Sequence, residues 1–140
     1  MTAAAERRDI EQLIGEEPYR FEFFQAVRVL ERLLRERNAP GRFANPQTEA
    51  VRFAAHNSTT FPASEIQSLQ WREGRAPLMV VNFMGLTGPE GVLPLYYTQF
   101  VAERVRAKDT AARDFLDIFN HRMISLFYQA WEKYRFAIAY

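Results

Sequence analysis

The residues of this sequence that could do acid–base or metal chemistry are few, and its two histidines come first. His121 follows Asp117 by four positions, so both side chains would lie on one face of a helix. Such a pair can orient a general base or contribute to a metal site. A closed metal site, however, needs about four ligands. We therefore interpret His121 and Asp117 as a solvated pair on a polar helix face, and His56, beside Asn57 and Ser58, as a loop residue.

Nucleophilic catalysis has no better support in the sequence. The serines at positions 58, 64, 68 and 125 lack the G-x-S-x-G context of a nucleophile elbow. The chain has no cysteine, which excludes disulfides and thiolate metal ligands. Because no set of nucleophile, base and oxyanion donors can be assembled, we expect a protein that is not an enzyme and that needs no cofactor.

A glycine-rich segment, GLTGPEG at residues 85–91, follows an expected strand and precedes an expected helix. That order is typical of phosphate-binding loops. The glycines at 85, 88 and 91 match neither G-x-G-x-x-G nor G-x-x-x-x-G-K-[ST], and Pro89 and Pro94 each remove a backbone donor. We interpret the segment as a tight structural turn. A small-ligand or nucleotide-binding enzyme that uses this loop is the alternative from a different class.

The element that must position His121 is the run from Asp109 to Phe136, which reads as one amphipathic helix of about seven turns. Asp109 is its expected N-cap. One broad face is apolar: Ala112, Phe115, Leu116, Phe119, Met123, Leu126, Phe127, Ala130, Trp131 and Tyr134. The opposite face is polar: Asp114, Asp117, His121, Ser125 and Glu132. Because Ile118, Tyr128 and Phe136 lie outside the apolar face, this helix must be buried on more than one side, by its own domain or by another chain.

The remaining chain is expected to form three more helices and three strands. The helices are predicted at residues 2–14, 19–38 and 94–107, with Thr2 as a cap and Gly15 as the end of the first. Strands are predicted at 51–55, 66–71 and 78–84, and the last of these, a continuous apolar run, is the expected central strand. The predicted fold is α+β, with about four helices, two of them long and aromatic-rich, around a small antiparallel sheet.

Composition limits the possible functions further. The 140 residues, 48% of them hydrophobic, suit a single domain over residues 1–140. The formal net charge is +1, without the basic excess that nucleic-acid binding requires, so we expect no nucleic-acid partner. The N-terminal residues lack an apolar core of signal-peptide length, and no segment of the given sequence reaches the ~18 unbroken apolar residues of a membrane span, so we expect neither feature here. We expect a cytoplasmic protein that is not itself inserted in a membrane.

Four segments carry a resemblance to a known family: EPYRFEFFQAVRVLERL (17–33), VRFAAHNSTTFPASEI (51–66), FMGLTGPEGVLPLYYTQFVAERVR (83–106) and DTAARDFLDIFNHRMISLFYQAWEKYRF (109–136). In this order they closely resemble the N-terminal part of TssG, the ImpH/VasB family of type VI secretion baseplate subunits. Family members are usually much longer, so we expect this chain to be an N-terminal part of such a subunit. For the same reason, we expect the parts of the family that reach TssK to lie largely outside this chain.

The resemblance implies a structural function. One TssG forms a baseplate wedge with two copies of TssF and with TssE, and is therefore part of a hetero-oligomer. The wedges surround the VgrG hub, bind TssK, and form the platform for the contractile sheath and tube at the inner face of the bacterial inner membrane. A wedge protein of another phage-derived contractile machine is the alternative in the same class. From the excess of apolar surface on the two long helices, we expect contacts with TssF at Phe21, Phe24, Tyr128, Trp131 and Phe136.

Overall fold

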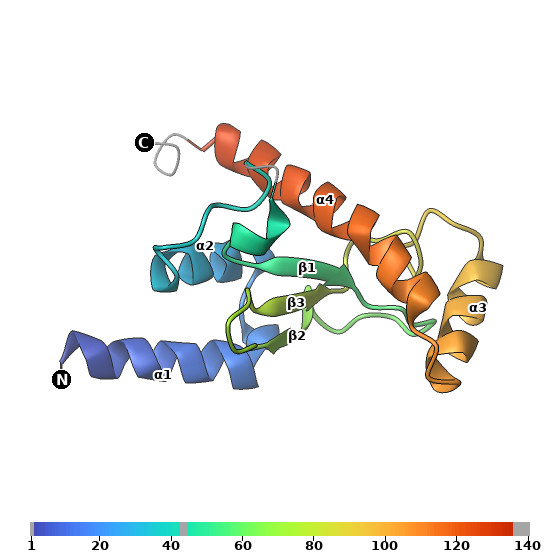
Figure 1. Ribbon diagram of the computed structural model, residues 1–140, viewed down its shortest axis with the longest axis horizontal. Helices are drawn as coiled ribbons and strands as arrows, with labels where there is room; N and C mark the ends of the chain where they lie inside the picture. The colour runs from blue at the N-terminus through green and yellow to red at the C-terminus, as the bar shows by residue number, and fades with distance from the viewer. Residues whose placement is uncertain (1, 43–44, 136–140) are drawn as a thin grey trace.

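The computed structural model describes residues 2–42 and 45–135. Within them lie the helices α1 (Ala3–Glu16), α2 (Phe23–Leu33), α3 (Leu95–Arg106) and α4 (Ala111–Lys133) and the strands β1 (Arg52–Ala55), β2 (Ile66–Gln70) and β3 (Leu78–Val81), with 3-10 turns at Pro18–Arg20 and Pro46–Thr48 (Figure 1). The predicted α+β class is confirmed, and each predicted helix and strand is present.

The sheet has the strand order β1-β3-β2, so β3 is the central strand, as predicted. The prediction of an antiparallel sheet was wrong in one respect. β2 pairs with β3 antiparallel, but β1 pairs with β3 parallel, with Phe53 opposite Met79. The reason is the connection at residues 56–65, which carries the chain from β1 to the far edge of the sheet, where β2 forms. A hairpin then leads from β2 back to β3 in the middle. β3 therefore runs in the direction of β1.

The helix boundaries differ from the predictions where backbone geometry intervenes. α2 begins only at Phe23, because Pro18–Arg20 form a separate 3-10 turn. α1 continues past Gly15 to Glu16, and Gly15 lies against Trp71, whose Nε1 would be 2.9 Å from an added Cβ. Thr110, not Asp109, is the N-cap of α4, while the Asp109 Oδ1 accepts a hydrogen bond from the Ala111 N–H at 3.1 Å. The end of α1 and the N-cap of α4 thus lie within two residues of their predicted places, whereas α2 begins four residues later than predicted and ends at Leu33, five residues before the predicted end at residue 38.

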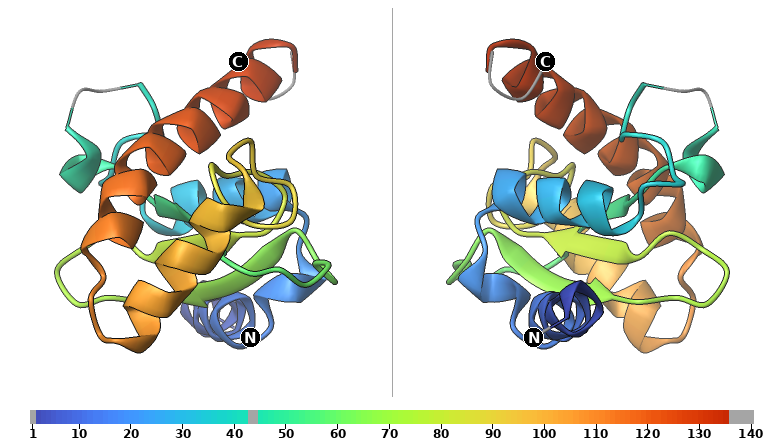
Figure 2. Two further views of the ribbon diagram at one scale, coloured as in Figure 1. Left: turned by 90° about the vertical axis from the view of Figure 1, so that its right-hand side faces the viewer. Right: turned by 90° about the vertical axis from the view of Figure 1, so that its left-hand side faces the viewer.

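The hydrophobic core lies between α2 and one face of the sheet. Phe23 and Leu30 of α2 are buried with Phe53 of β1 and Met79 of β3, and the Phe23 and Phe53 rings are 5.5 Å apart. Figure 1 shows α4 running along the β1 edge of the sheet and α1 along the β2 edge. Figure 1 and Figure 2 show α2 and α3 toward opposite ends of the strands. The long helix α4 is thus placed at an edge of the sheet and not over its face.

Candidate interaction surface

The orientation of α4 is the opposite of the one that its amphipathicity predicts. The residues of α4 that are buried against the domain are mostly polar: Asn120, His121, Ile124, Ser125, Tyr128 and Glu132. His121 is 3% exposed and Asn120 is 2% exposed. The prediction of a solvated His121 on a polar surface was therefore wrong. The polar face of α4 packs inward because the sheet edge beside it consists of backbone groups that need hydrogen-bond partners.

Side chains of α4 pair with the free edge of β1. The His121 Nδ1 accepts a hydrogen bond from the Phe53 N–H at 3.0 Å, and the Asp117 Oδ1 accepts one from the Ala55 N–H at 3.3 Å. β1 is an edge strand, and outward-facing amides on such a strand are otherwise available to other chains. Asp117 and His121, one helical turn apart, thus take the place of a further strand and close this edge.

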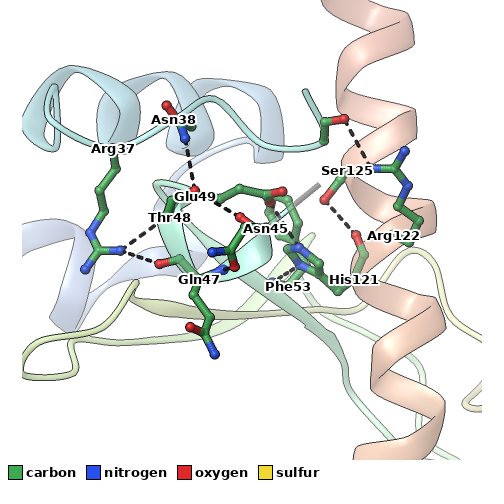
Figure 3. A network of polar contacts seen from close by, with 11 residues as sticks. Arg37, Asn38, Asn45, Gln47, Thr48, Glu49, Phe53, His121, Arg122 and Ser125 are labelled. Atoms are coloured by element: carbon green, nitrogen blue, oxygen red, sulfur yellow. Dashed lines mark hydrogen bonds and ion pairs between the residues drawn. The ribbon is translucent and has the colours of Figure 1, made fainter. Parts of the chain in front are cut away.

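The hydrogen bonds of His121 determine its tautomer. Because Nδ1 accepts from a backbone N–H, the proton of the neutral ring is on Nε2, which donates to the Glu49 Oε2 at 3.1 Å (Figure 3). Burial, together with the nearby cations Arg52 and Arg122, lowers the pKa of His121 to about 4. Burial also raises the pKa of Glu49. A neutral imidazole therefore links the segment before β1 to the middle of α4 (Figure 3).

Asn120, the neighbour of His121, anchors the glycine segment. Its Oδ1 accepts from the Leu86 N–H, and its Nδ2 donates to Asp117 Oδ1, both at 3.0 Å. An added Cβ on Gly85 would be 2.6 Å from the Ala55 Cβ. The Gly88 N–H donates to the Thr98 Oγ1 at 3.0 Å. Since these backbone amides already have partners within the chain, the geometry favours a packed structural turn over a phosphate-binding loop.

The C-terminal half of α4 is joined to α2 by a second polar contact. The Tyr128 hydroxyl donates to the Glu31 Oε2 at 3.2 Å, and the Tyr128 side chain is fully buried. Burial raises the pKa of Tyr128 and also that of Glu31. Arg42 and Glu132 form an ion pair at 2.7 Å nearby. These contacts hold the same side of α4 against the domain along most of its length.

The opposite side of α4 therefore carries large apolar side chains into solvent. We call it the exposed stripe, and it consists of Phe115, Ile118, Phe119, Met123 and Leu126, which are 60%, 57%, 48%, 37% and 45% exposed. The Phe115 and Phe119 rings contact each other with centroids 5.4 Å apart. A row of apolar side chains on one helix face marks a protein–protein interaction site.

The residues predicted to contact a partner lie in different environments. Phe24 and Trp131 form a parallel stack, with centroids 4.4 Å apart and planes at 9°, and both are half-buried. Phe21 is half-buried and packs on the core, and Tyr128 is part of the core. Phe136 lies outside the described residues. The structure thus brings Phe24, Tyr128 and Trp131 together at the α2–α4 contact and leaves the exposed stripe elsewhere on α4.

A second apolar surface was missed in the sequence. On α3 and just before it, Val92, Leu95, Tyr96 and Tyr97 are 78%, 59%, 68% and 46% exposed. Only Thr98 and Val101 of α3 are buried. The signal that could have indicated this surface is the run of large apolar residues Leu95, Tyr96 and Tyr97, which covers about 200° around the helix and is too wide for one buried face.

Within residues 2–42 and 45–135, no group of three or more His, Cys, Asp or Glu side chains is arranged to hold a metal ion. Among the helices of this described part, none is both long and apolar enough to cross a membrane.

Comparison with known proteins gives one match. Residues 17–140 match the family described as "Type VI secretion, TssG". No curated protein and no solved structure matches the chain. The match includes the FNHR segment around Asn120 and His121, and also the residues of the exposed stripe. Because it covers far more than half of the sequence, the chain belongs to the TssG family of type VI secretion, a family of structural baseplate components.

Proposed function

We propose that this chain is a wedge subunit that holds TssF through the exposed stripe of α4. In this proposal two copies of TssF and one TssE complete the wedge. TssK joins it to the membrane complex, and the wedges surround the VgrG hub and support the sheath. The site of action is the cytoplasmic face of the bacterial inner membrane. Membership of the TssG family supports the role in a baseplate, and the exposed stripe of α4 supports the proposed contact with TssF.

The single observation that carries the proposal is the inverted orientation of α4. His121 and Asp117 commit one side of the helix to β1, so the domain cannot rotate α4 to cover Phe115 and Phe119 without leaving backbone amides unpaired. Within residues 2–42 and 45–135 no element covers the stripe, and in this proposal TssF removes it from water. Burying the exposed half of each such side chain contributes about 1 kcal/mol. Five of them therefore supply a substantial part of the affinity of a helix-in-groove contact.

The test is co-expression of tagged TssF from the same gene cluster with this chain, followed by affinity capture and native mass spectrometry. The double variant Phe115→Ser and Phe119→Ser should lose capture, because it removes two large rings of the exposed stripe that contact each other. Phe61→Ser is the matched control, since Phe61 is 95% exposed and lies in a loop away from α4. Circular dichroism and Tm of each variant establish that the fold is intact.

Equal capture of the double variant and of the control would remove the exposed stripe from the TssF contact. The stacked pair Phe24 and Trp131 is the second part of the proposed interface. Together with Arg28 and Arg135, this pair lines a cleft of about 640 Å³. An aromatic or acidic side chain of the partner can enter this cleft.

A further inference from the structure

The sheet has a second face that no helix of the described chain packs against closely. Arg52 lies beside Leu78 across β1 and β3, and Ala54 lies beside Val80. These residues alternate with Phe53, Met79 and Val81, which point into the core. They line a cleft of about 750 Å³, whose other wall is formed by Val105 and Arg106 of α3. Leu78 and Val80 are half-buried, so the floor of this cleft is apolar and accessible.

Arginines gather along this cleft and along its continuation. Arg52 and Arg72 line both the first cleft and an adjoining one of about 700 Å³, which also includes Arg75. Arg106 and Arg113 stand at the α3 and α4 end. We call the two joined clefts the arginine groove. Burial and the charges of Arg75 and Arg52 lower the pKa of Arg72, which reflects how closely these cations are placed.

The acidic side chains in the groove do not neutralise these arginines. Asp117 accepts hydrogen bonds from the Ala55 N–H and from Asn120. Asp114 accepts from the Thr110 hydroxyl and pairs with Arg113 at 3.1 Å. Among the described residues, Arg52, Arg72, Arg75 and Arg106 have no carboxylate within ion-pair distance. Arg72 donates to the Ala76 carbonyl, and the charge of Arg52 acts on the buried Glu49, but neither forms an ion pair. The groove therefore presents four cations without a carboxylate at ion-pair distance above an apolar floor.

We propose that the arginine groove binds an extended acidic segment of a partner protein. Alternate side chains of an extended segment point in opposite directions, so apolar residues would rest on Leu78 and Val80 while carboxylates reach the guanidinium groups on the rim. Arginine pairs with carboxylates in bidentate geometry. None of the residues of the exposed stripe lines the groove, so the two surfaces are separate. The two surfaces can therefore hold different partners at once.

A peptide fits this groove better than a nucleic acid does. Proteins that bind single strands stack bases on aromatic side chains. The one aromatic ring lining the described groove, apart from the His56 imidazole, is Phe53, and its side chain is fully buried in the core. The net charge of the chain, +1, is also far from the basic excess of a nucleic-acid binder. The apolar floor, in contrast, suits aliphatic side chains.

The test uses the full chain and a fluorescein-labelled peptide that alternates Glu with Val or Thr. About ten residues give an extended length of about 33 Å. A peptide with Lys in place of Glu and a single-stranded oligonucleotide of equal negative charge are the comparison probes. Anisotropy at low salt measures each Kd, and amide chemical shifts of Ala54 and Val80 locate the bound peptide.

We expect the double variant Arg52→Gln and Arg106→Gln to raise the Kd of the acidic peptide about tenfold, the effect of losing two partly exposed ion pairs. The control variant, Arg8→Gln and Arg35→Gln, removes the same charge from exposed positions outside the groove and should leave the Kd unchanged. If the double variant does not fold, Arg75→Gln, at an exposed position, takes its place.

Equal Kd values for the groove variant and the control would overturn the proposal, because binding would then depend on net charge alone. Tighter binding of the oligonucleotide than of the acidic peptide would assign the groove to a nucleic acid and would equally overturn it. None of these outcomes depends on TssF, so failure of the wedge proposal and failure of this one can be told apart.

Discussion

The His121 Nδ1 accepts a hydrogen bond from the Phe53 N–H, although the two residues are 68 positions apart in the sequence. Through this bond a helix side chain completes the hydrogen bonding of a strand edge. The same ring donates from Nε2 to Glu49, so one imidazole joins three segments of the chain. This arrangement determines which side of α4 faces the domain, and therefore which side is left for a partner.

Replacing His121 with Ala should lower the free energy of unfolding by about 2–4 kcal/mol. The change leaves the Phe53 N–H and the Glu49 carboxylate buried without their partner, and each unmet polar group is costly. Urea denaturation followed by circular dichroism measures the difference. Met123→Ala, two positions along on the exposed side of α4, is the control and should cost under about 1 kcal/mol. A His121→Ala variant as stable as this control would contradict the structural role of the ring.

Stability should fall as the pH is lowered from about 6.5 to about 4. His121 has a pKa of about 4 in the folded protein and about 6.5 when unfolded, so the unfolded state binds its proton first. The contribution of the neutral His121 to the free energy of unfolding is complete above pH 6.5 and is lost progressively below it. It amounts to at most about 3 kcal/mol. Glu49 offsets part of it, because its pKa is raised and its protonation favours the folded state.

Unfolding free energies measured from pH 7.5 to pH 4 for the wild type and for His121→Ala isolate the contribution of the histidine. The wild type should lose more stability than the variant over this range. Parallel curves for the two proteins would show that His121 titrates normally, contrary to its buried neutral state.

Substitution of Gly85 by Ala should lower stability by about 1–3 kcal/mol, because the new Cβ would meet the Ala55 Cβ at 2.6 Å. Gly74→Ala is the comparison. Its φ of +69° is strained for alanine, but nothing lies within 4 Å of the added Cβ, so its cost should be about 1 kcal/mol. Thermal unfolding of both variants shows which substitution lowers the Tm more. A Gly85→Ala variant with the Tm of the wild type would show that this loop does not pack as the structure has it.

Addition of a nucleotide such as ATP should leave the Tm of the wild-type protein unchanged. The Leu86 and Gly88 amides are already bonded to Asn120 and Thr98 and are not free to hold a phosphate. Differential scanning fluorimetry with and without ATP is sufficient. A concentration-dependent rise in Tm would restore the small-ligand interpretation of this segment.

Tyr128→Phe should destabilise the domain by about 1–2 kcal/mol without weakening the capture of TssF. The hydroxyl is buried and donates a hydrogen bond to Glu31, so its loss leaves that buried carboxylate without this donor. The ring itself is covered by the domain and offers no surface to a partner. Chemical denaturation and the TssF capture assay report on the two effects separately. Weaker capture by a folded Tyr128→Phe variant would place this residue at the interface after all.

Trp131→Ala should weaken TssF capture more than Tyr134→Ala does. Trp131 stacks on Phe24 and lines a cleft beside α2, whereas Tyr134 is 80% exposed beyond the end of α4. Because Trp131 also packs against the core, the fold of each variant must be checked by its Tm. Unchanged capture by a folded Trp131→Ala variant would exclude this residue from the contact.

The sequence by itself determined where the elements lie, which strand is central and which family the chain resembles. These properties depend on local patterns, such as the continuous apolar run at β3 and the helical period of α4. Apolar spacing identifies helices well because each turn repeats the same geometry. It also indicated that apolar residues of α4 extend beyond one face, and it left open whether its own domain or another chain covers them.

Only the tertiary structure decided which face of α4 turns inward. Hydrophobic periodicity assumes that a neighbouring element offers apolar surface, but α4 meets the edge of β1, which offers backbone N–H groups and needs acceptors. The parallel pairing of β1 with β3 depends likewise on the path of residues 56–65. Arg52, Arg72 and Arg106 are scattered along the chain, and folding alone brings them to one groove.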